Sequence, residues 1–184
     1  MTLSDSERNI RKQFFAYRNG MLADTLRSAG NAYSVIFGLN LHQIVEIASA
    51  IQPDANLAQS FWNDRKCREA RLIAPMIMPR NAFSLQEASL WCEDVANNEE
   101  TDVLCHRLLR HLTVATELVE KYRKSSNESQ RYLAYRLLLN LLNTKSYTDY
   151  ATAQSLAENE LPDANVTLKA VLLSIIDFCS FCQE

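Results

Sequence analysis

Apolar residues along this chain recur at intervals of three and four positions, which is the spacing of one face of an α-helix. The segment LHQIVEIASAI, residues 41–51, shows the pattern most clearly, with its apolar face at Leu41, Ile44, Val45 and Ala48. No run of alternating Val, Ile and Thr bounded by turn residues predicts a strand. The pattern therefore predicts an all-α chain.

The N-terminal part of the chain predicts one long helix or two short ones over residues 4–28. The apolar set of this segment is Ile10, Phe14, Phe15, Tyr17, Met21, Leu22 and Leu26. The following segment, AGNAYSVIFGLN, interrupts the periodicity and indicates a break between helices.

Polar residues mark the starts of the next two helices. Pro53 ends the helix that begins near Leu41, and Asp54 is a candidate N-cap for ANLAQSFW. Asp64 is expected to cap a helix over residues 65–78, whose inward face would hold Ala70, Ile73, Ala74 and Ile77. Pro75 predicts a kink in that helix, because proline removes a backbone hydrogen bond and crowds the preceding turn.

A capping box predicts the next helix, from Leu85 to about Ala96, because Glu87 follows Ser84 by three residues. Asn98 or Thr101 then opens a helix that runs through Leu112. Further helices are expected at about 113–124, 127–143, 148–158 and 164–181. The short connections favour antiparallel neighbours arranged as helix hairpins.

An Arg-Leu pair recurs before an apolar helical run at Arg71, Arg107 and Arg136, with spacings of 36 and 29 residues. Hairpins of this size predict a short superhelical solenoid of the HEAT or ARM type, in which each hairpin packs on its neighbours. An irregular helical bundle is the alternative. The length of 184 residues suits one domain over residues 1–184.

Composition agrees with a helical chain in a reducing compartment. Only three glycines and four prolines are present, and the five cysteines are odd in number, which favours buried thiols over disulfides. Cys179 and Cys182 have C-x-x-C spacing but lack a second pair. No apolar run reaches the ~18 residues of a membrane span. We therefore expect a cytoplasmic protein without a membrane segment.

Charge is unevenly distributed although the net charge is only −3. Residues 65–80 carry five bases against one acid, and residues 107–145 carry eight bases against three acids. Residues 81–106 between them carry six acids and no base. The two basic bands fit a groove that binds phosphates around a carboxylate. They also fit ordinary solvated helix faces.

Three segments resemble the DNA alkylation repair family, the HEAT-like-repeat alkylpurine DNA glycosylases. FWNDRKCREARLIAPMI resembles a family hairpin that contains E-A-R, and IFGLNLHQIVEIASAI is similar to the helix before it. LQEASLWCEDVANNEETDVLC resembles the family segment W-x-x-D-x-x-x-W-D-x-C-D-x-x-C. The resemblance covers about residues 30–140. It implies a HEAT-like fold, double-stranded DNA as partner, and hydrolysis of the N-glycosidic bond of N-alkylated purines.

The resemblance also implies a catalytic residue. The last Asp of that family segment falls on Asp102, and the following Cys falls on Cys105. In the family this Asp is held to stabilise the positive charge that develops on the sugar as the bond to the base breaks. The alternative for Asp102 is an acid in the first turn of a helix, which the helix dipole favours.

The chain departs from the family at two neighbouring positions, because Asn98 replaces a Trp and Glu99 replaces an Asp. A basic contact of the family maps best to Arg131, with Arg136 as the weaker candidate. The remaining candidates for contact with the DNA backbone are Arg65, Lys66, Lys121, Arg123 and Lys124.

Two functions from different classes therefore stay open. The first is an alkylpurine DNA glycosylase that uses Asp102. The second is a non-catalytic HEAT-like module that binds DNA or a protein partner, its activity lost with the family Trp. The histidines show no metal-binding spacing, and P-loop, G-x-G-x-x-G and G-x-S-x-G motifs are absent, so we expect no metal and no cofactor.

Two further pairs of residues are expected to be structural. Glu69 and Arg71 should form an ion pair within or between helices. Trp62 and Trp91, the only tryptophans, should fill gaps between hairpins.

Overall fold

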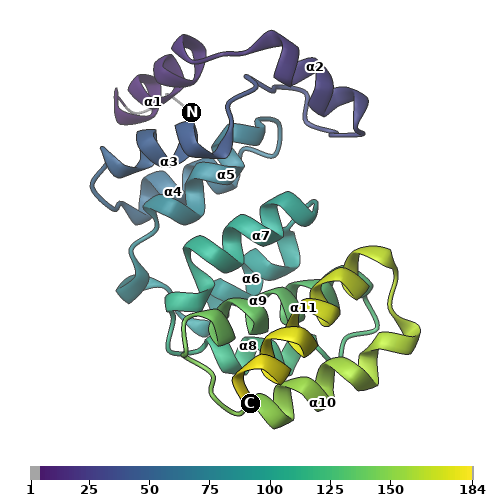
Figure 1. The fold of residues 1–184 in the computed structure, drawn as a ribbon. Helices are drawn as coiled ribbons and strands as arrows, with labels where there is room; N and C mark the ends of the chain where they lie inside the picture. The colour runs from purple at the N-terminus through teal and green to yellow at the C-terminus, as the bar shows by residue number, and fades with distance from the viewer. Residues whose placement is uncertain (1–4, 184) are drawn as a thin grey trace. The chain divides into compact units, whose positions relative to one another are not determined.

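The computed structural model describes residues 5–183, and most of this range is helical (Figure 1). The α-helices are α1 (Asp5–Ala16), α2 (Gly20–Ser28), α3 (Leu41–Ser49), α4 (Ala55–Trp62), α5 (Arg68–Ile77), α6 (Leu85–Asp94), α7 (Asn98–Arg107), α8 (Ala115–Tyr122), α9 (Glu128–Asn143), α10 (Tyr150–Glu160) and α11 (Val166–Gln183). Short 3₁₀ turns lie at Arg80–Ala82 (η1), Leu109–His111 (η2) and Leu161–Asp163 (η3). The prediction of an all-α chain is confirmed.

The chain forms two compact units, the first ending at Ala82 and the second beginning at Phe83. The first unit holds α1 to α5, and α5 packs against both α3 and α4. Three phenylalanine rings join the helices and a loop in its core, with Phe14 at 5.9 Å from Phe37 and 6.2 Å from Phe61 between ring centroids. The expected inward face of α5 is confirmed, because all four of its apolar residues are buried.

A buried carboxylate organises the loop before α3. Glu69 is fully buried and accepts backbone N–H bonds from Phe37, Gly38 and Leu39 at 3.0 to 3.3 Å. Arg68 donates to the same carboxylate and to the carbonyl of Leu39. Because Glu69, Arg68 and the Leu39 backbone are buried, each needs its partner. Glu69 therefore fixes the entry of the chain into α3.

Arg71, the other charged residue of the E-A-R motif, serves the same unit in a different way. Its guanidinium carbon lies 3.6 Å from the centroid of the Trp62 ring, and its Nη1 donates to the Trp62 carbonyl. Trp62 and Trp91 are both buried, as expected of core residues. The motif that carries much of the family resemblance is thus part of the core of the first unit.

Gly38 is required by the same loop. Its φ is +79°, and a Cβ at this position would lie 2.1 Å from the backbone oxygen of Asn19. The backbone N–H of Asn19 in turn donates to the carbonyl of Phe37 at 2.8 Å. The loop and the N-terminus of α2 therefore approach at a distance that only glycine permits.

Two expectations for the first unit are corrected by the structure. Asp64 is not the N-cap of α5, which begins at Arg68 with Cys67 as its cap residue. One oxygen of Asp64 accepts the N–H of Lys66 and the other accepts Arg11 of α1, 53 positions away, so the carboxylate serves a turn and an ion pair. The apolar set of α1 and α2 also includes exposed residues, with Phe15 at 59% and Met21 at 82% exposure.

Helix α9 forms the centre of the second unit (Figure 1) and packs against α7, α8 and α11. Its burial is nearly continuous from Tyr132 to Leu142. The capping box of Ser84 and Glu87 is present at α6, and Asp54 accepts the N–H of Leu57 at α4, so both predicted caps are confirmed. Within residues 5–183, no helix combines the length and the apolar character needed to cross a membrane.

Candidate functional site

Asp102 lies on α7 and is held by two side chains of α9. The hydroxyl of Tyr132 donates to Oδ1 of Asp102 at 2.8 Å, and Nε of Arg136 lies 2.9 Å from the same oxygen. The angle at Nε does not meet hydrogen-bond geometry, so the contact with Arg136 is an ion pair. Tyr132 and Arg136 are four residues apart, which places them on one face of α9.

The second oxygen of Asp102, Oδ2, is not held by either side chain of α9. Both contacts use Oδ1, and among residues 5–183 no partner is recorded for Oδ2. The side chains of Asp102 and Arg136 are 38% and 32% exposed. The carboxylate is thus fixed through one oxygen and can present the other to a ligand.

Burial raises the pKa of two groups near the Asp102 carboxylate, the Tyr132 hydroxyl and the Cys105 thiol. Burial and the hydrogen bond to Asp102 raise the pKa of the Tyr132 hydroxyl, so it stays protonated at neutral pH and donates. Burial also raises the pKa of the Cys105 thiol, whose Sγ donates to the Leu133 carbonyl at 3.6 Å. A fully buried thiol that holds its proton is unreactive, so Cys105 is a core residue here.

Asn98, Asp102 and His106 recur every four residues and so form one stripe along α7. A cavity of about 100 Å³ lies at the first of them, with Tyr132 in its wall. Its other lining residues are Glu128, Ser129, Asn165 and Thr167. Asn98, onto which the sequence resemblance places the family Trp, is thus an exposed amide beside a small polar cavity.

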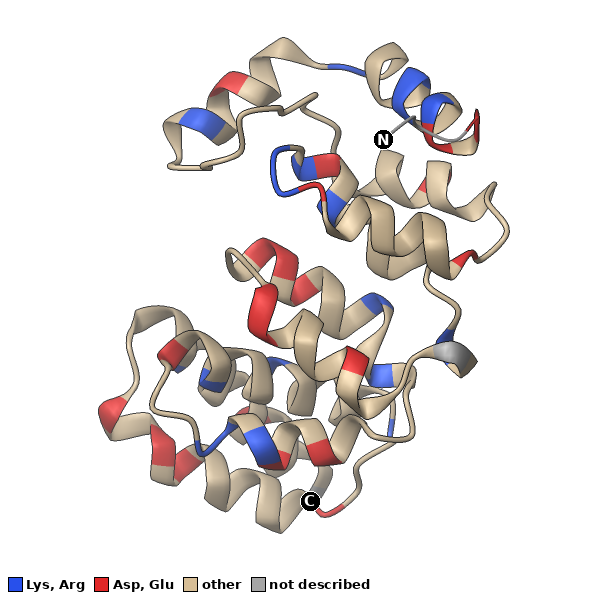
Figure 2. Ribbon diagram, turned by 180° about the vertical axis from the view of Figure 1, so that it is seen from behind, with Lys and Arg blue, Asp and Glu red and all other residues tan. Residues whose placement is uncertain are grey.

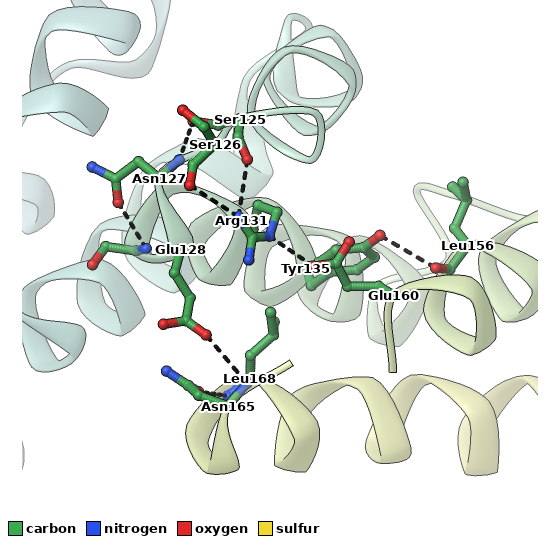
Figure 3. A network of polar contacts seen from close by, with 11 residues as sticks. Ser125, Ser126, Asn127, Glu128, Arg131, Tyr135, Leu156, Glu160, Asn165 and Leu168 are labelled. Carbon is green, nitrogen blue, oxygen red and sulfur yellow. Dashed lines mark hydrogen bonds and ion pairs between the residues drawn. The ribbon is translucent and has the colours of Figure 1, made fainter. Parts of the chain in front are cut away.

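Arg131 does not lie beside Asp102. Its Nε donates to Glu160 at 2.7 Å, and its Nη1 donates to the carbonyls of Ser125 and Ser126 (Figure 3). The Arg131 and Glu160 side chains are only 18% and 17% exposed. Arg131 thus ties the start of α9 to the end of α10, whereas Arg136 makes the contact with the candidate carboxylate.

The other candidate cations are spread over both units. Lys121 pairs with Glu93 at 3.1 Å, and Arg123 and Lys124 both pair with Glu120. Arg65 and Lys66 are exposed in the loop before α5 of the first unit. Glu99 lies in the first turn of α7 and is partly exposed. The surface ion pairs of Lys121, Arg123 and Lys124 leave these basic groups accessible but partly neutralised.

Sequence reasoning missed Tyr132. The available signal was its place one turn before Arg136, which puts the two side chains on one helical face. Their meeting with Asp102 depends on the packing of α7 against α9 and joins residues 30 and 34 positions apart.

Comparison with known proteins agrees with this fold. A sequence profile of the family described as "DNA alkylation repair enzyme" matches residues 10–171. No curated protein matches the sequence significantly. A solved structure described as "a new family of proteins related to the HEAT-like repeat DNA glycosylases with affinity for branched DNA structures" superposes with a TM-score of 0.82.

That match covers 93% of this chain and 74% of the other chain, at 15% sequence identity. At this identity the likeness is one of fold, and it confirms the predicted HEAT-like repeat architecture. The family match extends over most of the chain and through both units. The chain therefore belongs to the DNA alkylation repair enzyme family.

Proposed function

We propose that this protein binds alkylated double-stranded DNA and hydrolyses the N-glycosidic bond of N-alkylated purines, with Asp102 as the catalytic residue. The observation that carries the proposal is the geometry of the carboxylate, which is anchored through Oδ1 and, within residues 5–183, has no side-chain partner at Oδ2. A group held in this way is pre-organised for charge that develops in the transition state. The family membership of the chain supports the same chemistry.

The reaction needs little from the protein beyond a negative charge placed close to the sugar of the alkylated nucleotide. An N-alkylated purine is a cation while it is attached to the sugar. When the bond between C1′ and the ring nitrogen breaks, the base takes the electron pair and leaves neutral, and positive charge develops on the sugar. Oδ2 of Asp102 would stabilise that charge, after which water adds to C1′ and releases a proton.

Tyr132 and Arg136 act as positioning residues in this proposal. The Tyr132 hydroxyl and the Arg136 guanidinium hold Oδ1 from α9, so the carboxylate cannot rotate freely. Arg136 is also partly exposed and available to a phosphate oxygen of the bound strand. Asn98 supplies an amide where an aromatic face would otherwise meet the cationic base.

DNA binding without chemistry is the second candidate function. The positive charge of Arg136 lies 2.9 Å from Oδ1 and offsets part of the negative charge that the transition state would use. The solved structure with the same fold is described by an affinity for branched DNA, without mention of catalysis. A protein that kept the fold and lost the aromatic contact would recognise DNA alone, or bind a protein partner.

Release of methylated purines from alkylated duplex DNA separates these functions. We expect wild-type protein to release bases and Asp102→Asn to be slower by orders of magnitude, since the substitution removes the charge but keeps the shape. Binding of intact duplex and of a four-way branched duplex is measured alongside at two salt concentrations. Salt-dependent binding without release from wild type would favour the DNA reader, and neither release nor binding would favour a protein partner.

A further inference from the structure

Helix α11 carries large apolar side chains on its solvent-exposed face. Val166, Leu173 and Phe181 are 87%, 49% and 78% exposed. The opposite face of the helix packs against α9 and α10 and holds the buried residues Leu168, Leu172, Ile175 and Cys179. Single exposed apolar residues are ordinary on a protein surface, whereas several on one helix face indicate a contact surface.

The exposed residues of α11 follow the spacing of a helix–helix contact. Four of them lie at successive steps of four, three and four positions, and all four are exposed: Val166, Ala170, Leu173 and Asp177. Steps of three and four residues are those with which two helices pack along a seam. Phe181 continues the series after a further step of four. We call these five residues the α11 seam.

The exposed face of α11 carries one base and one acid. Lys169 and Asp177 are the only charged residues among the 18 of this helix, whereas acidic residues gather at the start of α7 (Figure 2). Both are exposed and, within residues 5–183, neither side chain forms an ion pair. A face whose charges cancel does not favour a polyanion such as DNA. The face suits an apolar partner that brings one base and one acid of its own.

The order of these charges makes the α11 seam complementary to itself. Lys169 lies four residues before Leu173, and Asp177 lies four residues after it. In an antiparallel pair of α11 helices with a two-fold axis at Leu173, residues equally far before and after this leucine lie at the same level. Lys169 of each copy is then opposite Asp177 of the other copy, so the attraction occurs twice. A parallel pair would instead bring like charges together.

We propose that the protein forms a homodimer in which the α11 seams of two copies pack antiparallel about a two-fold axis at Leu173. Leu173 meets its own copy at the axis, and Val166 of one copy lies beside Phe181 of the other at each end. Specific interfaces bury about 1,200–2,000 Å² in total, and one helix face per copy is at the small end of this range. The dimer is therefore reversible, with a dissociation constant on the order of micromolar. It does not depend on the proposed DNA chemistry.

An exchange of the two charges tests the proposal. Analytical ultracentrifugation of the full chain, from low micromolar to near millimolar concentration, measures dimerisation. Lys169→Glu places an acid opposite Asp177 twice and should weaken the dimer about tenfold, and Asp177→Lys should do the same. The double variant with both substitutions restores two pairs of opposite charge and should recover the wild-type dissociation constant. A parallel pair, or a dimer through another surface, would give no such recovery.

Lys12→Glu is the matched control, because it reverses one exposed lysine of α1 and changes the net charge by the same amount as Lys169→Glu. Leu173→Asp, at an exposed position, brings two like charges together at the axis and should abolish the dimer. Circular dichroism establishes that each variant is folded. Wild-type protein that stays monomeric at every concentration would overturn the proposal and leave the α11 seam to a helix of another protein. A double variant as weak as the single ones, or an equal loss in Lys12→Glu, would also overturn it.

Discussion

The hydroxyl of Tyr132 donates to Oδ1 of Asp102 at 2.8 Å across the packed faces of α7 and α9. Replacing this tyrosine by phenylalanine removes one anchor of the carboxylate while the ring remains buried. A hydrogen bond to a charged group contributes about 1.5–3 kcal/mol, so Tyr132→Phe should slow base release about tenfold or more.

Tyr135→Phe is the control for this prediction, since its hydroxyl donates to the Leu156 carbonyl and does not touch Asp102. Single-turnover release from methylated duplex DNA measures both variants. Equal rates for the two would show that anchoring of the carboxylate is irrelevant to the reaction.

Arg131 and Arg136 lie on the same helix but have different partners. We expect Arg131 to contribute to stability and Arg136 to contribute to function. Arg136→Gln should slow base release and weaken DNA binding, because it removes one of the two groups that hold Oδ1 of Asp102 and a cation available to phosphate. Arg131→Gln should mainly lower the free energy of unfolding by about 1–3 kcal/mol, because two carbonyls and Glu160 lose their donor. Urea unfolding and base release on both proteins check this division, which a reversed pattern would contradict.

These two arginines also show how far the sequence alone could go. Local features were readable: Asp54 and the pair Ser84 and Glu87 cap their helices as predicted, because a cap depends on residues within one turn. The sequence did not show whether Arg131 or Arg136 contacts Asp102. Five residues correspond to about 140° around a helix, and only the packing of α7 on α9 shows which face meets Asp102.

Asp64 illustrates the same limit in the first unit. Its sequence context fits an N-cap, but its carboxylate is taken by Arg11 of α1 and by the turn at Lys66. Asp102 itself was found through family resemblance. Its partner Tyr132 became visible only once side chains from separate helices were placed in space.

Gly38 and Gly20 give opposite predictions for the same substitution. Gly38→Ala should lower the free energy of unfolding by at least about 2 kcal/mol, since alanine disfavours positive φ and its Cβ would meet the Asn19 backbone. Gly20→Ala, which has open space around it at the start of α2, should be neutral or stabilising by about 0.5–1 kcal/mol. Chemical denaturation of both variants decides, and similar effects would contradict the predicted role of the loop.

Glu69 should be the most sensitive carboxylate of the first unit. Glu69→Gln leaves the buried Arg68 without its counter-charge and weakens the acceptor for three backbone N–H groups, at an expected cost of about 3–5 kcal/mol. Exposed Glu46→Gln is the control and should change stability by less than about 0.5 kcal/mol. Thermal unfolding followed by circular dichroism distinguishes them, and a small effect at Glu69 would contradict its structural role.

The lowered pKa of His106 predicts that part of the free energy of unfolding is lost at acid pH. Its pKa in the folded protein is about 4 against an ordinary value of 6.5, so the unfolded chain binds more protons between these values. Stability from this group is therefore fully present above about pH 6.5 and is lost as the pH falls toward 4. Because His106 is partly exposed, solvent screening limits the loss to the order of 1 kcal/mol.

His106→Gln should remove this component, whereas His42→Gln at an exposed position of α3 should leave it in place. Urea unfolding at pH 7.5, 5.5 and 4.5 measures the difference, and identical pH profiles for wild type and His106→Gln would show that burial and the neighbouring cations do not lower the pKa of this imidazole.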